Sequence, residues 1–244
     1  MSMAPLGPVR VKICGLTKPD DMNAVAAAGA AYAGLVFFPK SPRNLQPAQA
    51  RAIALAAPAG LARVGLFVDP TDADLDRVLS EVPLDLLQLH GKESPQRVAE
   101  LRARHGLPVI KAVGIADQGD LPALATYGRV ADMLLVDAKP PREAPLPGGN
   151  GLSFDWRLIA GRRWPVPWML AGGLTPQTVG EAIGLTGARQ VDVSSGVESA
   201  PGVKDAARIT DFCRAAQACV RCRRPLDPAF LRLLPGRRHG MPLL

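Results

Sequence analysis

The chain has 244 residues, of which 48% are hydrophobic, and a formal net charge of +7. This length suits a single domain with a sizeable core, and no stretch reaches the roughly 18 uninterrupted apolar residues of a membrane span. The first residues lack the apolar segment of a secretory signal. Four clustered cysteines are too few for the disulfide framework of a secreted domain. We therefore expect a cytoplasmic protein with reduced thiols and no membrane contact.

Most of the positive charge lies at the C-terminal end. From Gln217 to Leu244 six arginines face one acid, Asp227, which leaves +2 of the total +7 for the rest of the chain. Phe230 is the only aromatic residue among these arginines, whereas platforms for single-stranded nucleic acid interleave several. We expect no nucleic-acid partner and divide the chain into a domain over 9–216 and an Arg/Pro-rich tail over 217–244, whose composition favours disorder.

Strands and helices alternate along the chain. Apolar segments bounded by turn residues predict strands at 9–14, 32–37, 62–68, 86–89, 108–113, 133–137, 166–171 and 189–193. Helical spacing occurs at 20–28, 47–57, 71–81, 95–105, 175–185 and 205–216, with shorter, interrupted segments at 120–125 and 154–159. Helix starts are marked at Gln46-Pro47, Thr71-Asp72, Ser94-Pro95 and Thr175-Pro176. Eight such units predict an α/β fold, a single-domain (β/α)8 TIM barrel with a short basic C-terminal extension.

Catalytic residues of such barrels lie at the C-terminal ends of the strands. Cys14 ends the first strand, and although a free cysteine is most often a small buried hydrophobe, this place favours a base or nucleophile if nearby cations lower its pKa. Asp137 ends the strand LLVD, where apolar neighbours favour the protonated acid that general acid catalysis needs. The alternative for Asp137 is a structural carboxylate paired with Lys111.

Three further polar residues stand at strand ends. Arg43 lies in the segment KSPRN, and a guanidinium held by a proline-stiffened loop can bind a planar carboxylate through two hydrogen bonds, although a surface arginine is the ordinary interpretation. Asp192 is placed to orient a phosphate turn or substrate hydroxyls, and pairing with a structural lysine is an equal alternative. His90 is placed to shuttle protons, yet a single histidine beside a glycine turn is more often structural.

Two turns late in the chain predict a phosphate site. The segments at 168–177 and 189–199 each run from an apolar strand into a turn, containing first Gly172 and Gly173 and then Ser194, Ser195 and Gly196. Backbone N–H groups at a strand-to-helix turn, with the positive end of the following helix, bind an anion without Lys or Arg. Their order matches the phosphate site that follows strands 7 and 8 of many (β/α)8 barrels.

We expect no metal site. No two histidines or carboxylates have ligand spacing within one predicted barrel loop, and CVRC at 219–222 lacks a second cysteine pair, so zinc there with His239 is a weak alternative. GGNG at 148–151 lacks the strand-to-helix context of a dinucleotide loop. We interpret it as a flexible loop that closes over the end of the sixth strand.

Seven motifs, in order, resemble the phosphoribosylanthranilate isomerase family of tryptophan biosynthesis. They are VKICGLT at 11–17, GLVFFPKSPRNL at 34–45, LLQLHG at 86–91, LLVDA at 134–138, GGNGLSFDW at 148–156, LAGGLTP at 170–176 and VDVSSGVES at 191–199. The resemblance spans residues 9 to about 212 and leaves the tail outside the family pattern. It implies an Amadori rearrangement of N-(5-phosphoribosyl)anthranilate to 1-(2-carboxyphenylamino)-1-deoxyribulose 5-phosphate, without metal or organic cofactor; we further expect a monomer.

The resemblance also implies roles for individual residues. Asp137 matches the acid that protonates the ring oxygen, Cys14 the base that removes a proton from the second sugar carbon, and Arg43 the residue that binds the anthranilate carboxylate. The amides of Gly172, Gly173, Ser195 and Gly196 match the phosphate site, whereas His90 and Asp192 match substrate-binding positions of less certain role.

Two alternatives stay open at this point. The histidine-pathway isomerase of the same fold carries out the same rearrangement with two aspartates on a substrate with two phosphates. Cys14, and the lack of a second Gly-Gly or Ser-Gly turn after strands 3 and 4, argue against it. The other is a nonenzymatic protein that binds nucleic acid through its basic tail.

Overall fold

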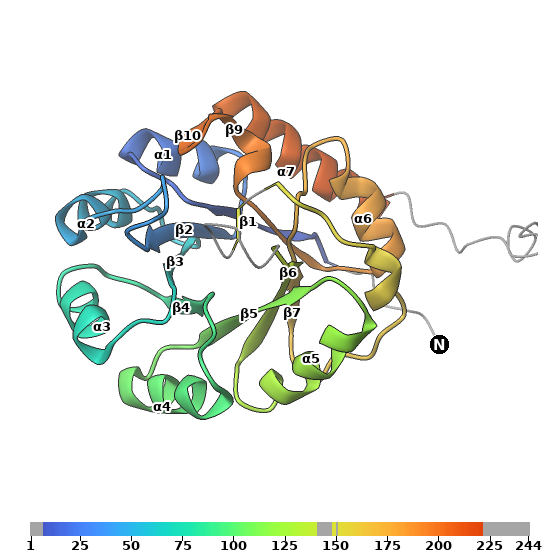
Figure 1. Ribbon diagram of the computed structural model, residues 1–244. Coiled ribbons are helices and arrows are strands. Elements are labelled where there is room, and N and C mark those ends of the chain that lie inside the picture. The colour runs from blue at the N-terminus through green and yellow to red at the C-terminus, as the bar shows by residue number, and fades with distance from the viewer. Residues whose placement is uncertain (1–6, 141–147, 150, 222–244) are drawn as a thin grey trace, which may run out of the picture.

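Eight parallel strands form a closed barrel in a computed structural model that describes residues 7–140, 148–149 and 151–221 (Figure 1). The strands are β1 Arg10–Cys14, β2 Tyr32–Phe37, β3 Ala62–Phe67, β4 Leu86–Leu89, β5 Val109–Ile115, β6 Met133–Ala138, β7 Trp168–Leu170 and β8 Gln190–Val193. Each pairs with its neighbours along the chain, and β1 pairs with β8 to close the barrel. The predicted (β/α)8 fold is confirmed, with all eight strands at the expected places.

Helices surround the barrel (Figure 1). The α-helices are α1 Pro19–Ala27, α2 Pro47–Leu55, α3 Asp72–Leu79, α4 Pro95–His105, α5 Leu121–Tyr127, α6 Val179–Thr186 and α7 Ala206–Arg221, and the short 3-10 helices are η1 Gln118–Asp120, η2 Trp156–Ile159 and η3 Ser195–Val197. Three helix starts agree with the capping prediction: α2 and α4 begin with proline, and the Thr71 hydroxyl accepts a hydrogen bond from the Asp74 N–H at the start of α3.

The C-terminal part of the chain differs from the prediction in four places, the first being that α7 continues past residue 216 to Arg221. The segment at 154–159 forms only the single 3-10 turn η2. Helix α6 begins at Val179 rather than near Thr175, because the Thr175 and Thr178 side chains cap each other's backbone N–H groups in a separate turn. After β8 the chain forms an unpredicted hairpin of β9 Glu198–Ala200 and β10 Val203–Lys204 before α7.

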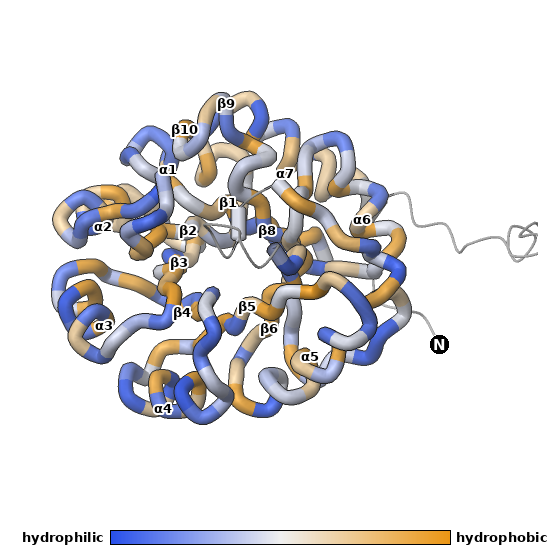
Figure 2. The backbone as a smooth tube through the Cα atoms, viewed as in Figure 1, coloured by the Kyte–Doolittle hydropathy of each residue, from blue (hydrophilic) through white to orange (hydrophobic). Residues whose placement is uncertain are grey.

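Two apolar layers hold the barrel together. The larger one lies between the strands and the helices and contains, for example, Ile13, Leu35 and Phe212. A smaller cluster, with Tyr32, Ile110 and other strand residues, lies on the opposite face of the strands, inside the barrel. Hydrophilic residues gather on the outer helices and loops (Figure 2). A third, small cluster of Cys14, Val36 and Leu66 lies at the C-terminal ends of the strands, beside polar side chains such as Asp137 and Asp192.

Candidate active site

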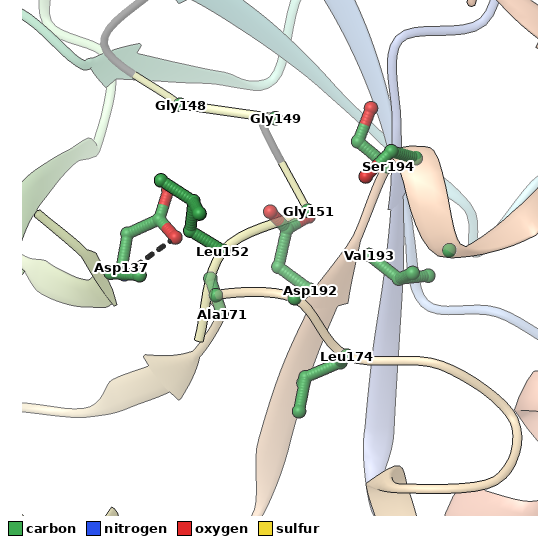
Figure 3. A pocket seen from close by; sticks show the side chains of 15 residues that line it. Asp137, Gly148, Gly149, Gly151, Leu152, Ala171, Leu174, Asp192, Val193 and Ser194 are labelled. Atoms are coloured by element: carbon green, nitrogen blue, oxygen red, sulfur yellow. Dashed lines mark hydrogen bonds between the residues drawn. The ribbon is translucent and has the colours of Figure 1, made fainter. Parts of the chain in front are cut away.

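All ten candidate site residues line two adjoining cavities at the C-terminal ends of the strands. The first is lined by Asp137, Asp192 and the two predicted phosphate turns, and the second by Cys14, Arg43 and His90 with Asp137, Asp192 and Ser194. Both cavities also contact Gly148 and Gly149. Figure 3 shows these two glycines over the carboxylates of Asp137 and Asp192, with Ser194 at the side. The predicted residues thus share one continuous site.

Cys14 lies at the end of β1, where it is 4% exposed. The strand register pairs Cys14 with Gly34, and a Cβ added to Gly34 would lie 2.9 Å from Cys14 Sγ and 3.2 Å from Lys12 Nζ, so glycine leaves room for both groups. Burial raises the pKa of the Cys14 thiol, the Lys12 ammonium opposes this rise, Asp192 adds to it and Lys204 opposes it. The net shift of the Cys14 pKa is upward, so the neighbouring cations do not lower it below its ordinary value, as the sequence-based expectation of a base had required.

Lys12 is fully buried inside the barrel and was missed as a site residue. Opposite it in the register of β1 and β8 lies Asp192, and Lys12 Nζ donates a 2.9 Å hydrogen bond to Asp192 Oδ1. Burial lowers the pKa of Lys12, but Asp192 and Cys14 outweigh it, so the net shift is upward. The lysine partner foreseen as one alternative for Asp192 is therefore present. The sequence did contain one indication that Lys12 belongs to the site: Lys12 and Cys14 are two residues apart, so their side chains share a face of β1.

Asp137 lies at the end of β6 and faces His90. Its Oδ1 accepts a 2.8 Å hydrogen bond from the Ala138 N–H, and its Oδ2 lies 3.3 Å from His90 Nε2. The other ring nitrogen of His90 is 2.9 Å from the side-chain nitrogen of Gln88. The alternative partner Lys111 pairs with Glu93 at 2.7 Å instead. In the part of the chain that the structure describes, Asp137 is therefore a carboxyl group at the cavity wall with His90 as its neighbour and no lysine partner.

The two phosphate turns present unpaired backbone amides. Within the described part of the chain the N–H groups of Gly172, Gly173, Ser195 and Gly196 donate no hydrogen bond. Glycine is required, because Gly172 has φ +88° and a Cβ on Gly196 would lie 2.0 Å from the Leu174 carbonyl oxygen. The expected helix contribution is smaller than predicted, since η3 has three residues and α6 starts only at Val179. The unpaired amides are therefore the donors that these turns offer to an anion.

Arg43 lies at the cavity wall but is already paired. Two of its nitrogens donate to the carboxylate of Glu198, which also accepts a hydrogen bond from Lys204. Burial raises the pKa of Glu198, but these two cations outweigh it and the net shift is downward. Glu198 and Lys204 were missed in the sequence, although Glu198 stands within the motif VDVSSGVES.

The structure gives further information on two expected absences. Among residues 7–140, 148–149 and 151–221 no three His, Cys, Asp or Glu side chains are grouped to hold a metal ion, and no helix is long and apolar enough to cross a bilayer. The weak zinc alternative at Cys219, Cys222 and His239 lies outside the side chains that the structure describes.

Gly148 and Gly149 lie over the end of β6, and a Cβ on Gly148 would be 2.9 Å from Asp137 Oδ2.

Comparisons with known proteins agree with this arrangement. A family model described as N-(5'phosphoribosyl)anthranilate (PRA) isomerase matches residues 11–215. The chain belongs to the phosphoribosylanthranilate isomerase family. It is 66% identical over 209 residues to the N-(5'-phosphoribosyl)anthranilate isomerase of Cereibacter sphaeroides, covering 86% of this chain and 99% of that protein. The family assignment makes the chain an isomerase and decides against the histidine-pathway alternative.

Solved phosphoribosylanthranilate isomerases have the same fold. The enzyme of Thermotoga maritima superimposes with a TM-score of 0.78 at 38% identity, covering 86% of this chain and 99% of that one. A second structure, with a TM-score of 0.75 and 36% identity over 86% of this chain and 99% of its own, is a complex with reduced 1-(o-carboxyphenylamino)-1-deoxyribulose 5-phosphate. That ligand carries a carboxylate at one end and a phosphate ester at the other.

Proposed function

We propose that this site converts N-(5-phosphoribosyl)anthranilate to 1-(2-carboxyphenylamino)-1-deoxyribulose 5-phosphate in tryptophan biosynthesis. The observation that carries the proposal is the convergence of a thiol, Cys14, and a carboxyl group, Asp137, on one cavity that continues into the turns with free amides. A small phosphosugar with an aromatic carboxylate fits a cavity that offers a thiol, a carboxyl group and free amides in this spatial order. A ligand of this kind is bound in the structure of a relative.

Asp137 is the proposed general acid. Opening the ribose ring breaks the bond between the anomeric carbon and the ring oxygen, and a proton delivered to that oxygen makes it a neutral hydroxyl leaving group. The electron pair on the anthranilate nitrogen then forms the C=N bond of a Schiff base. Among the described residues Asp137 has the Ala138 N–H and His90 as its polar partners and lines both cavities, so its carboxyl group is placed to reach a sugar bound there.

Cys14 is the proposed base. The protonated Schiff base acidifies the hydrogen on the second sugar carbon, and the Cys14 thiolate takes that proton, leaving an enolamine that tautomerises to the ketone product. Lys12 supports this role because its ammonium stabilises negative charge on the neighbouring sulfur. Two groups with different environments thus divide the acid and the base step.

The two ends of the substrate are anionic and meet different donors. We assign the phosphate to the amides of Gly172, Gly173, Ser195 and Gly196, and the anthranilate carboxylate to Arg43. Asp192 and His90 line the cavity between these ends and are assigned to the sugar. Every assigned group comes from one chain, so we propose that a monomer is sufficient for activity. A cytoplasmic location stays a prediction, and so does a division between residues 216 and 217, across which α7 continues to Arg221.

The test is a fluorescence assay that follows the loss of freshly prepared phosphoribosylanthranilate. Wild-type protein should turn it over, and Cys14→Ser should remain folded but lose about 10² to 10⁴ in kcat, the usual contribution of one acid–base group. Cys213→Ala is the matched control, because Cys213 is a buried cysteine on α7, outside both cavities. Equal turnover by Cys14→Ser and wild type would overturn the proposed role, and no turnover by folded wild type would overturn the function.

A further inference from the structure

A buried cluster of three charged side chains joins the Arg43 loop to the phosphate turn. Glu198, at the start of β9, accepts hydrogen bonds from Nε and Nη2 of Arg43, both at 2.7 Å, and from Nζ of Lys204 at 2.6 Å. All three residues are at most 6% exposed. Charges this far from water are stable only with their partners in place, so the cluster has a fixed geometry.

The cluster leaves one side of the Arg43 guanidinium for a ligand. Nε and Nη2 point at Glu198, whereas Nη1 points toward Gly149, which lines the same cavity. A Cβ on Gly149 would lie 3.0 Å from Nη1. Nη1 has no acceptor within the part of the chain that the structure describes. The stem of Arg43 is also confined, because a Cβ on Gly15 would lie 2.4 Å from its Cδ. Glu198 therefore determines where Nη1 points.

Lys204 extends the cluster to the phosphate turn. Its Nζ donates to the backbone oxygen of Ser194 at 3.0 Å and to Ser194 Oγ at 3.3 Å. The Ser194 hydroxyl in turn donates to the Cys14 carbonyl oxygen at 2.9 Å. The hairpin that carries Glu198 and Lys204 thus contacts Arg43 on one side and, on the other, Ser194, which directly precedes the amides assigned to the phosphate.

We propose that Glu198 is a positioning residue that sets the preference for a substrate with an aromatic carboxylate, and that Lys204 fixes the phosphate turn. The inference rests on the proposed function, because it deepens the roles given there to Arg43 and the turn amides. A guanidinium held through two hydrogen bonds cannot rotate in its plane, so its remaining N–H groups meet a carboxylate at one place only. A preference for that carboxylate follows from Glu198, although Glu198 does not touch the substrate.

The experiment measures binding rather than turnover. Two probes are titrated by calorimetry: reduced 1-(2-carboxyphenylamino)-1-deoxyribulose 5-phosphate and the same compound without the carboxylate. Wild type should prefer the first. Glu198→Gln should reduce this preference about tenfold, the value of one charged hydrogen bond, while the affinity for the second probe changes little. Lys204→Met keeps the Arg43–Glu198 pair, so it should weaken both probes by a similar factor and leave the preference unchanged.

Two further variants keep the test valid if Glu198→Gln is poorly folded. The double variant Glu198→Gln/Lys204→Met removes one anion and one cation, so its buried net charge equals that of wild type, and it should also lose the preference. In an Arg43→Met background the preference should already be absent, and Glu198→Gln should reduce it no further.

Two outcomes would contradict these expectations. A Glu198→Gln protein that keeps the wild-type preference, or that weakens both probes equally, would overturn the positioning role while leaving the proposed function intact. Wild type that binds neither probe would overturn the proposed function, and this inference with it.

Discussion

Replacing Asp137 with asparagine removes the proposed proton donor at almost no cost in volume. Asparagine keeps an oxygen that can accept the 2.8 Å hydrogen bond from the Ala138 N–H, and it exchanges only the oxygen that lies 3.3 Å from His90 Nε2. One changed hydrogen bond should lower the free energy of unfolding by about 1 kcal/mol. Loss of general acid catalysis should lower kcat/KM by about 10² to 10⁴, which raises the barrier by about 3 to 5 kcal/mol.

Because the expected rise in the reaction barrier is several times the expected loss of folding stability, the effect of Asp137→Asn on catalysis can be distinguished from an effect on folding. The measurements are kcat/KM from the decay of substrate fluorescence, the melting temperature, and the affinity for the reduced product analogue. We expect a large fall in the first and small changes in the other two. A kcat/KM within about threefold of wild type would refute the role of Asp137, and so would a rate loss that only follows a loss of folded protein.

Three further predictions concern the thiol, the phosphate turn and the tail. Burial raises the pKa of Cys14 against the opposing effect of Lys12, so alkylation of Cys14 by iodoacetamide, measured by mass spectrometry, should increase through a midpoint at higher pH than that of an ordinary cysteine thiol. Lys12→Met should move that midpoint to still higher pH; an unchanged or lower midpoint contradicts this. Gly196→Ala places a Cβ 2.0 Å from the Leu174 carbonyl oxygen and should raise KM about tenfold or more, whereas Gly184→Ala, with nothing within 4 Å, should leave KM unchanged. A chain that ends at Arg221, where α7 ends, should keep wild-type kcat and KM, and a loss of turnover would assign a catalytic function to the tail.

The barrel and its strand-end residues were predictable because they depend on local patterns. Each buried strand is a short apolar run, and the residue that ends it, such as Cys14 or Asp137, is read directly from the sequence. The two turns after β7 and β8 were also read from local sequence, and Gly172 and Gly196 stand in them where no side chain fits. Their role as a phosphate site stays a prediction.

The charged partners of these residues were not predictable by the same reasoning. Lys12 pairs with Asp192, 180 positions later, and Arg43 pairs with Glu198, 155 positions later, so both pairs depend on how β8 closes the barrel against β1. Local capping signals were also insufficient at Thr175-Pro176, where the threonine pair forms a turn of its own and delays α6. Such contacts are decided by tertiary packing, which overrides local preference.

In the proposed site the phosphate end is made of main-chain N–H groups, whereas the end proposed for the aromatic carboxylate depends on the side chains of Arg43 and Glu198. A single codon change exchanges a side chain, but of the encoded residues only proline removes the main-chain N–H. Evolution or engineering can therefore adapt this barrel to other sugar phosphates by changing side chains at the aromatic end. The main-chain amides proposed to bind the phosphate ester are retained wherever the fold is retained.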